Sequence, residues 1–344
     1  MIVFRADGNN KIGLGHIMRC LSIAEAFKRN GKDCLFVAAK DNLSHIITER
    51  GYNCIILNSN PYKLDEEKTQ FLQVLKDYSV EAVIVDSYYV TEKYLNAIKN
   101  AYYTVYIDDV YSFAYPVDCL VNYGINASKE KYARLYEGKE LPELLIGTNF
   151  VPLRSEFCDL ERREQPKAIK NIFVSTGGSD SEHIALSLTE CLKKSDKYKN
   201  YTFHIIVGAA NYDRDKIVNL SKDIENISVY SNVSKISRLM LVCDAAISAA
   251  GSTMFELCAC GLPIVTYTLA DNQLDNAKAF CQKGIAVSAG DVRNNSEFAK
   301  TLLEVADKTF SDNNRCKSMS ESACDLVDGK GADRLAQSLT ELFF

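Results

Sequence analysis

His16 is the side chain of this sequence best placed to act as a general base. It follows a turn with glycines at positions 8, 13 and 15, and it begins the amphipathic stretch 16–31. At the start of a helix the backbone dipole disfavours a positive charge, so we expect a neutral imidazole there, able to accept a proton. The residue could instead serve only as a helix cap, and the local sequence favours neither interpretation.

The turn before His16 does not match the glycine pattern of a dinucleotide-binding loop. Gly13 and Gly15 supply a G-x-G pair, but Met18 stands where the third glycine is required. The lysine of a phosphate-binding loop is also missing. We therefore interpret the segment as a strand-to-helix turn that places His16 at the start of the helix.

A second candidate site lies in the stretch 245–265, AAISAAGSTMFELCACGLPIV. The pattern predicts a strand ending at 249, a turn at Gly251 and a helix with Ser252 as its N-cap. Free N–H groups around Ser252 and Thr253 would suit a phosphate. Glu256 falls on the same helical face and could accept hydrogen bonds from two ribose hydroxyls. A capped core helix with a solvated glutamate explains the pattern equally well.

Two further turns could contribute to the same ligand. The segment NIFVSTGGSD (171–180) brings Gly178 and Ser179 to the end of a predicted strand, where paired glycines permit close approach to a ligand. Asn272 and Gln273 follow another strand and carry amides that can donate to and accept from sugar hydroxyls. Capping of a helix start is the alternative role for this amide pair.

Acidic residues end two strands of the first half. The segment VDSYYV places Asp86 and Tyr88 on one side of its strand end, and YIDDV presents Asp108 and Asp109. Two adjacent aspartates can indicate a metal, but we find no further ligands at suitable spacing and expect no metal. The sequence leaves the roles of Asp108 and Asp109 open.

The elements that must position these residues are short apolar strands alternating with helices. We predict strands over 1–6, 34–40, 53–58, 82–87, 104–109, 119–123, 171–176, 202–208, 227–232, 245–249 and 263–268. Continuous apolar runs indicate parallel strands covered on both faces, and the alternation indicates two doubly wound α/β domains. Ligands of such domains bind at the carboxyl ends of the strands.

The charged, proline-containing stretch 158–170 separates the two series of strands. We therefore predict an N-terminal domain over 1–157, a linker over 158–170, a C-terminal domain over 171–330 and a final helix over 331–344. That helix is amphipathic and could pack on either domain.

Composition excludes several other classes of protein. The formal net charge is −5 without a basic run, so we expect no binding to nucleic acid or to a membrane surface. The twelve cysteines show neither CxxC pairs nor zinc-ligand spacing, which favours reduced thiols in the cytoplasm. We find no signal peptide and no membrane-spanning run, and we expect a cytoplasmic monomer.

Several motifs together resemble one known family. They are RADGNNKIGLGHIMRCLSIA, VDSYYV, IDDV, FVPLRSEF, VSTGGSD and AAGSTMFELCACGLPIVTYTLADNQ, spread over nearly the whole chain. The chain is similar to the UDP-sugar hydrolases of pseudaminic acid biosynthesis, a pathway tied to flagellin glycosylation. This resemblance implies the GT-B fold, with two Rossmann-like domains facing a cleft, as in the MurG-type glycosyltransferases.

The resemblance also implies an activity and site roles. The substrate would be UDP-2,4-diacetamido-2,4,6-trideoxy-β-L-altropyranose, hydrolysed to UDP and free sugar without a metal or cofactor. His16 would be the base for water, attacking the anomeric carbon with inversion, and Tyr88 would either take part in catalysis or position the substrate. The remaining expected substrate-binding residues are Asp7, Gly13, Gly15, Arg19, Gly178, Ser179, Gly251, Ser252, Thr253, Glu256, Asn272 and Gln273.

The sequence departs from the family pattern at Ala250, where a second glycine is more usual, but Gly251 and Ser252 remain. Three alternatives stay open. A glycosyltransferase of the same fold would use the same UDP elements with an acceptor other than water. A UDP-sugar 2-epimerase matches the motifs less well. A non-enzymatic sugar-nucleotide binding protein would not need the pair His16 and Tyr88.

Overall fold

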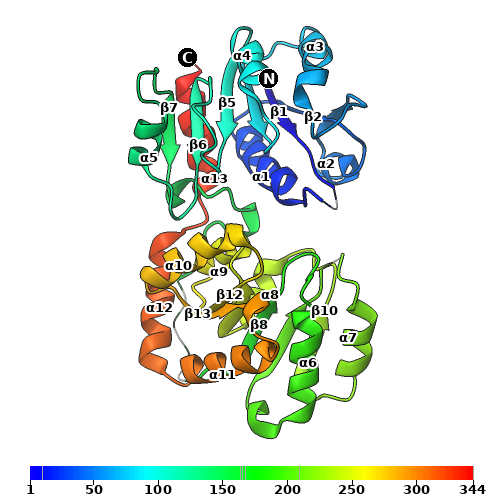
Figure 1. Ribbon diagram of the computed structural model, residues 1–344, viewed down its shortest axis with the longest axis vertical. Coiled ribbons are helices and arrows are strands. Elements are labelled where there is room, and N and C mark those ends of the chain that lie inside the picture. Colours follow the sequence, from blue (N-terminus) through cyan, green and yellow to red (C-terminus); the bar gives the residue numbers. More distant parts are fainter. Residues whose placement is uncertain (10, 163, 165, 167, 209, 344) are drawn as a thin grey trace. The chain divides into compact units, whose positions relative to one another are not determined.

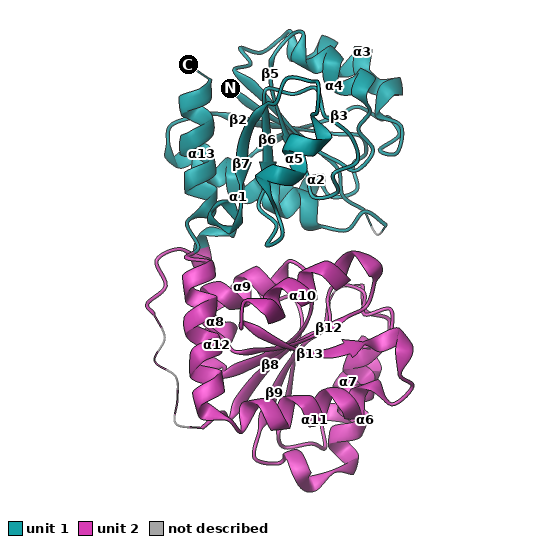
Figure 2. Ribbon diagram, turned by 60° about the vertical axis from the view of Figure 1, so that its left-hand side comes forward, with its two compact units in different colours: residues 1–155, 329–344 teal, residues 156–328 magenta. Residues whose placement is uncertain are grey.

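The computed structural model describes residues 1–9, 11–162, 164, 166, 168–208 and 210–343. The chain forms two compact units, residues 1–155 with 329–344 and residues 156–328 (Figure 2). It passes from the first unit to the second at Ser155–Glu156, just before the expected linker 158–170, and returns at 328–329. Positions 163, 165 and 167 of that linker, and position 344 of the expected last helix, lie outside the described residues.

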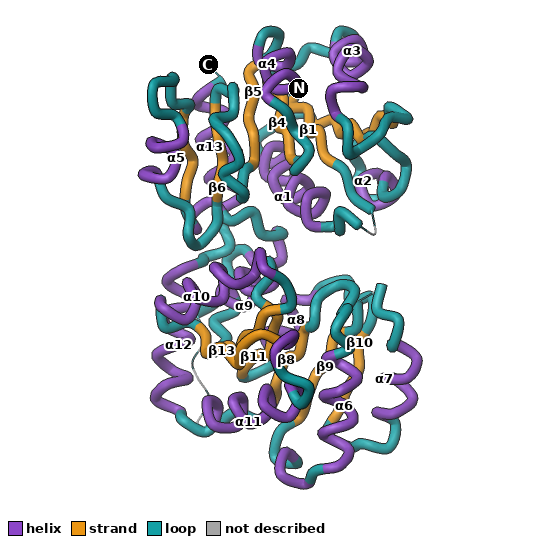
Figure 3. The backbone as a smooth tube through the Cα atoms, in the orientation of Figure 1, coloured by secondary structure: helices purple, strands orange, loops and turns teal. Residues whose placement is uncertain are grey.

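The first unit contains a seven-stranded parallel sheet with the order β3-β2-β1-β4-β5-β6-β7. Figures 1 and 3 label several of these strands. Its strands are β1 (Ile2–Ala6), β2 (Cys34–Ala38), β3 (Asn53–Ile56), β4 (Ala82–Asp86), β5 (Tyr103–Ile107), β6 (Cys119–Asn122) and β7 (Glu143–Ile146). The first six correspond to predicted strands. The seventh strand, β7, was not predicted; it is a four-residue edge strand whose apolar run is only three residues long, Leu144 to Ile146.

Helices cover both faces of this sheet. They are α1 (Gly15–Arg29), α2 (Ser44–Thr48), α3 (Leu64–Leu75), α4 (Glu92–Lys99), α5 (Lys129–Leu135) and α13 (Gly331–Leu342). One core packs α1 and α13 against Phe4 and Ile84, and the other packs α3 and α4 against Val3 and Val83. Alternate strand residues thus face opposite cores, which explains the continuous apolar runs.

The last helix, α13, belongs to the first unit. It packs along α1, and Arg29 of α1 forms an ion pair with Asp333. Gly331, at its start, packs so tightly that an added Cβ would lie 2.2 Å from the carbonyl oxygen of Val151. A glycine is therefore required where the chain re-enters this unit.

The second unit contains a six-stranded parallel sheet with the order β10-β9-β8-β11-β12-β13. Its strands are β8 (Asn171–Ser175), β9 (Thr202–Ile206), β10 (Ile227–Tyr230), β11 (Ala245–Ala249), β12 (Ile264–Thr268) and β13 (Ala286–Asp291). Its helices are α6 (Ile184–Lys194), α7 (Arg214–Ser221), α8 (Ile236–Val242), α9 (Thr253–Ala259), α10 (Leu274–Gln282), α11 (Phe298–Phe310) and α12 (Asn313–Leu326). The edge strand β13 was not predicted, because it consists mostly of small and polar residues.

Each sheet reverses its strand order once, and this decides where ligands can bind. In the first unit β1 lies between β2 and β4, and in the second β8 lies between β9 and β11. The loops leaving neighbouring strands diverge to opposite faces at such a point and leave a crevice at the carboxyl ends. His16 follows β1, Asp86 ends β4, and the glycine turns follow β8 and β11. Across the described residues, no helix is long and apolar enough to cross a membrane.

Candidate active site

His16 is held by a carboxylate from the neighbouring strand. It is the second residue of α1, and Asp86 is the last residue of β4, paired in register with Ala6 of β1. His16 Nδ1 lies 2.5 Å from Asp86 Oδ1, and both residues are buried. Two acceptors would repel at this distance, so we assign the proton to Nδ1 as the donor to Asp86. The opposite nitrogen, Nε2, is then left as a proton acceptor.

The predicted amphipathic helix after His16 is confirmed. The stripe of Ile17, Cys20, Leu21, Ala24 and Phe27 is buried. The helix ends at Arg29, followed by a glycine with φ +74° at position 31. The core stripe therefore fixes the rotation of α1, and with it the direction of the His16 side chain.

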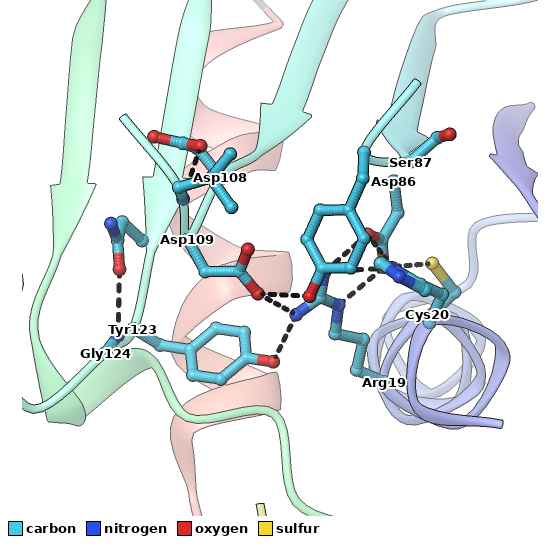
Figure 4. A network of polar contacts seen from close by, with 12 residues as sticks. Arg19, Cys20, Asp86, Ser87, Asp108, Asp109, Tyr123 and Gly124 are labelled. Carbon is cyan, nitrogen blue, oxygen red and sulfur yellow. Dashed lines mark hydrogen bonds and ion pairs between the residues drawn. The ribbon is translucent and has the colours of Figure 1, made fainter. Parts of the chain in front are cut away.

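Asp86 remains ionised although it is completely buried. Burial by itself would raise its pKa, but the charges of Arg19 and then His16 outweigh this and hold the pKa well below its usual range. Arg19 Nε donates to Asp86 Oδ2 at 2.5 Å, Arg19 Nη2 donates to Oδ1, and Cys20 Sγ lies 3.5 Å from Oδ2 (Figure 4). A fixed negative charge beside Nδ1 would stabilise the imidazolium that forms when His16 takes a proton.

Arg19 bonds two aspartates, Asp86 at the end of β4 and Asp109 in the loop after β5. Besides the paired bonds to Asp86, its Nη1 donates to the Tyr123 hydroxyl at 2.8 Å and to Asp109 Oδ2 at 3.2 Å (Figure 4). Substrate binding by Arg19, expected from the sequence, stays a prediction. In the structure its donors bond the side chains of Asp86, Asp109 and Tyr123, and these bonds suit Arg19 to hold those residues in position. We call His16, Arg19, Asp86, Tyr88, Asp109 and Tyr123 the His16 cluster.

Tyr88 lies directly against His16. The two rings meet edge to face with centroids 4.7 Å apart, and the Tyr88 hydroxyl donates to Asp109 Oδ2 at 3.1 Å. Burial, followed by the charge of Asp109, raises the pKa of Tyr88 above its usual value, so the phenol keeps its proton at neutral pH. These contacts favour a positioning role over action as a base.

The two adjacent aspartates have different environments. Asp108 is buried and accepts hydrogen bonds from the hydroxyls of Tyr115 and Tyr132, at 2.9 and 2.6 Å. It also accepts from the N–H of Val110, at 3.0 Å. Asp108 therefore stabilises the loop after β5, whereas Asp109 belongs to the His16 cluster. The sequence could not separate the two roles.

Asp7, an expected substrate-binding residue, is engaged by the fold itself. Its Oδ2 accepts from Arg5 Nη1 at 2.7 Å, and its Oδ1 accepts from the N–H of Ala39 at 2.7 Å. Arg5 is fully buried and also donates to Glu67 of α3, at 2.6 and 3.0 Å. This network anchors the carboxyl end of β1, and its sequence signal was a lone arginine within an apolar strand.

Gly13 and Gly15 lie in the turn that precedes His16. Gly13 has φ +85°, a conformation that other residues seldom adopt, and its N–H donates to the carbonyl of Asn9 at 2.7 Å. A Cβ added at Gly13 or Gly15 would meet no atom of the described residues within 4 Å. No close contact with another described residue therefore requires a glycine at either position. Position 10 of this turn lies outside the described residues.

In the second unit, the loops after β8 and β9 touch backbone to backbone. A Cβ added at Gly208 would lie 2.2 Å from the carbonyl oxygen of Gly178, whereas one at Gly177 or Gly178 would meet no atom of the described part of the chain within 4 Å. Ser179 is exposed beside them. Gly208 was not among the predicted site residues; the absence of a side chain there lets its loop pack directly against the loop that carries Gly178 and Ser179.

The turn after β11 lies beside the amide segment after β12. A Cβ on Gly251 would come within 4.0 Å of Gln273 Nε2, and Gln273 Oε1 accepts from the N–H of Leu269 at 2.9 Å. Gln273 is thus brought next to Gly251, while Asn272, in the same 3₁₀ turn, is exposed. The predicted position of Ser252 at the N-cap of α9 is confirmed, although its side chain makes no capping hydrogen bond.

The second unit also holds Thr253 and Glu256, the other residues expected to contact UDP. Thr253 begins α9, and Glu256 lies one turn further along it. Both side chains are partly exposed, which leaves them accessible to a ligand. The strand ends of this unit therefore gather three of the predicted turns, at 177–179, 251–256 and 272–273.

Comparisons with known proteins show what the chain resembles. Residues 171–338 match the model of the glycosyltransferase family 28 C-terminal domain. MurG of Acinetobacter baumannii has a similar structure, with a TM-score of 0.73, 15% identity and 99% coverage of both chains. This likeness and the two parallel-sheet units establish the predicted GT-B fold.

Relatives in sequence are distant and carry different names. The uncharacterized protein MJ1062 of Methanocaldococcus jannaschii is 25% identical over 79% of this chain, which spans 56% of that protein. A UDP-N-acetylglucosamine–N-acetylmuramyl-(pentapeptide) pyrophosphoryl-undecaprenol N-acetylglucosamine transferase of Finegoldia magna is 24% identical, over 90% of each chain. The UDP-2,4-diacetamido-2,4,6-trideoxy-beta-L-altropyranose hydrolase of Campylobacter jejuni is 23% identical, over 83% of this chain and 98% of the hydrolase.

Proposed function

We propose that this protein hydrolyses UDP-2,4-diacetamido-2,4,6-trideoxy-β-L-altropyranose to UDP and the free sugar, a step of pseudaminic acid biosynthesis. The observation that carries the proposal is the buried pair of His16 and Asp86, which orients an imidazole with Nε2 as proton acceptor. A base for water is what distinguishes a hydrolase from a protein that only binds a sugar nucleotide. The name of the Campylobacter jejuni relative supports the choice of substrate.

In the proposed reaction His16 Nε2 removes a proton from water while the water oxygen attacks the anomeric carbon. The bond between that carbon and the β-phosphate oxygen breaks, and its electron pair leaves with UDP. Attack on the face opposite UDP inverts the anomeric configuration. Asp86 stabilises the imidazolium, Arg19 keeps Asp86 ionised, and Tyr88 holds the substrate against His16.

The second unit would bind UDP. Backbone N–H groups at Gly178, Ser179 and Gly251 to Thr253 are proposed to bind the diphosphate and to stabilise the charge that develops on it. Glu256 would accept hydrogen bonds from the ribose hydroxyls, and the amides of Asn272 and Gln273 would face the sugar. These roles rest on the motif resemblance and on the placement of all three turns at strand ends of one sheet.

Such a mechanism uses no metal or cofactor. Within the described part of the chain no group of three or more histidine, cysteine, aspartate or glutamate side chains is arranged to hold a metal ion. We expect turnover to be unchanged by EDTA. Loss of activity on chelation, with recovery on adding a divalent ion, would contradict this expectation.

A glycosyltransferase of the same fold is the second candidate, and two observations favour it: the match to the family 28 domain and the name of the Finegoldia magna relative. The test is to incubate the purified protein with the proposed substrate in ¹⁸O-water, with no acceptor. Hydrolysis at the anomeric carbon puts the label in the free sugar and leaves UDP unlabelled. Label in the β-phosphate would overturn the mechanism, and turnover only with an added acceptor would identify a transferase.

A further inference from the structure

Asp109 differs from the other aspartates near His16 because only one of its carboxylate oxygens is engaged. Oδ2 accepts from the Tyr88 hydroxyl at 3.1 Å and from Arg19 Nη1 at 3.2 Å. No hydrogen bond from another described residue reaches Oδ1, and the side chain is 36% exposed. One oxygen is therefore fixed by the protein, while the other has no hydrogen-bond partner among the described residues and belongs to a partly exposed side chain.

Neighbouring carboxylates show the contrast. Both oxygens of Asp86 are taken by Arg19, His16 and Cys20, and that residue is completely buried. Asp108 is also buried, with both oxygens accepting from tyrosine hydroxyls. Of these three carboxylates, Asp109 is the one that retains an accessible acceptor.

We propose that Asp109 Oδ1 accepts a hydrogen bond from the sugar of the substrate and so selects sugars that carry a donor at that position. This inference rests on the proposed function, since it takes the sugar to be bound against His16. Tyr88 links the two residues: its ring packs on His16 while its hydroxyl bonds Asp109. Asp109 therefore lies beside the base, where the sugar must be bound for water to attack it.

The bonds on Oδ2 would hold Oδ1 in a fixed position, ready to accept a hydrogen bond from the sugar. A carboxylate anchored by a guanidinium and a phenol has little rotational freedom left to lose when substrate binds. Hydrogen bonds to a charged acceptor are stronger than neutral ones, and a site built around such a bond rejects an analogue that lacks the donor. Asp109 is thus suited to specificity rather than to proton transfer.

The proposed sugar offers three donors. Its name places acetamido groups at carbons 2 and 4 and a deoxy position at carbon 6, so the hydroxyl at carbon 3 and two amide N–H groups remain. Three near-isosteric analogues each remove one donor: the 3-deoxy sugar, and the sugars with acetoxy in place of acetamido at carbon 2 or carbon 4.

The test compares these analogues in the wild-type protein and in Asp109→Asn. The amide can keep an oxygen toward Arg19 and Tyr88 while presenting NH₂ to the substrate, which replaces the acceptor by a donor. For the wild type we expect kcat/KM to fall by about 10- to 150-fold for one analogue, the range for a hydrogen bond to a charged group. In Asp109→Asn that discrimination should shrink to within about threefold, while the affinity for UDP itself is unchanged. Asp77→Asn, an exposed aspartate after α3, is the matched control.

The outcomes separate this inference from the proposed function. If the wild type releases no sugar from the proposed substrate, the function fails. If the wild type is active but Asp109→Asn retains its discrimination against all three analogues, the role of Asp109 is overturned. Equal loss of activity on every sugar, accompanied by a lowered melting temperature, would show a structural role and also overturn it. Tyr88→Phe leaves Asp109 on Arg19 alone, and we expect it to weaken the discrimination without abolishing it.

Discussion

Replacing His16 by asparagine tests the proposed base with little disturbance of its surroundings. The amide nitrogen of asparagine can occupy nearly the position of the imidazole Nδ1, so it can keep the hydrogen bond to Asp86 that now spans 2.5 Å. What disappears is the far side of the ring, including Nε2 and the edge-to-face contact with Tyr88. Asp86 therefore keeps its partners and is not left as an unpaired buried charge.

The expected loss of activity follows from the role of the base. Removing a positioned general base lowers turnover by about 10²- to 10⁴-fold. The affinity for UDP should be nearly unchanged, because we assign UDP to the second unit. The stability cost should stay within the usual range for a single substitution, about 0.5–3 kcal/mol.

Three measurements test this prediction together. A continuous assay of UDP release gives kcat and KM, calorimetry gives the UDP affinity, and thermal unfolding monitored by circular dichroism confirms that the variant folds. A folded His16→Asn protein that retains more than a tenth of wild-type turnover would refute the reasoning.

Three further predictions follow from other parts of the structure. Glu256→Ala should weaken UDP binding by about 1.5–3 kcal/mol, the value of hydrogen bonds to a charged group, and unchanged affinity by calorimetry would refute its role at the ribose. Gly208→Ala should lower both the melting temperature and the UDP affinity, because the added Cβ would lie 2.2 Å from the carbonyl oxygen of Gly178. Gly138→Ala is a control for backbone strain alone, because Gly138 has φ +74° but no described atom within 4 Å of an added Cβ. The pKa of Asp86 is lower in the folded protein than in the unfolded chain, so ionised Asp86 stabilises the fold. This stabilisation is complete above the unfolded pKa of about 3.9 and decreases as the pH falls toward the folded pKa. The difference in unfolding free energy between wild type and Asp86→Asn should therefore be larger at pH 7 than at pH 3, and a constant difference would contradict this account.

Local pattern was sufficient for most of the strands and for the first helix. Eleven strands could be predicted because each is a short run of apolar residues, and α1 because its stripe repeats with helical spacing. Two of the four edge strands, β3 and β10, were predicted, whereas β7 offers an apolar run of only three residues, Leu144 to Ile146, and β13 consists mostly of small and polar residues. The same local logic located His16 at a strand-to-helix turn.

What the sequence alone determined is therefore the α/β architecture and the turns at which chemistry could occur. Only the tertiary structure decided which residues of those turns belong to the His16 cluster and which stabilise the fold. His16 and Asp86 are 70 residues apart, and Arg19 and Tyr123 are 104 apart; they meet because β1, β4, β5 and β6 are neighbours in one sheet. Strand order is set by packing over the whole unit, so it cannot be predicted from a local sequence pattern. For that reason the sequence could list Asp108 and Asp109 as equals, while the sheet buries one among tyrosines and leaves the other beside the base.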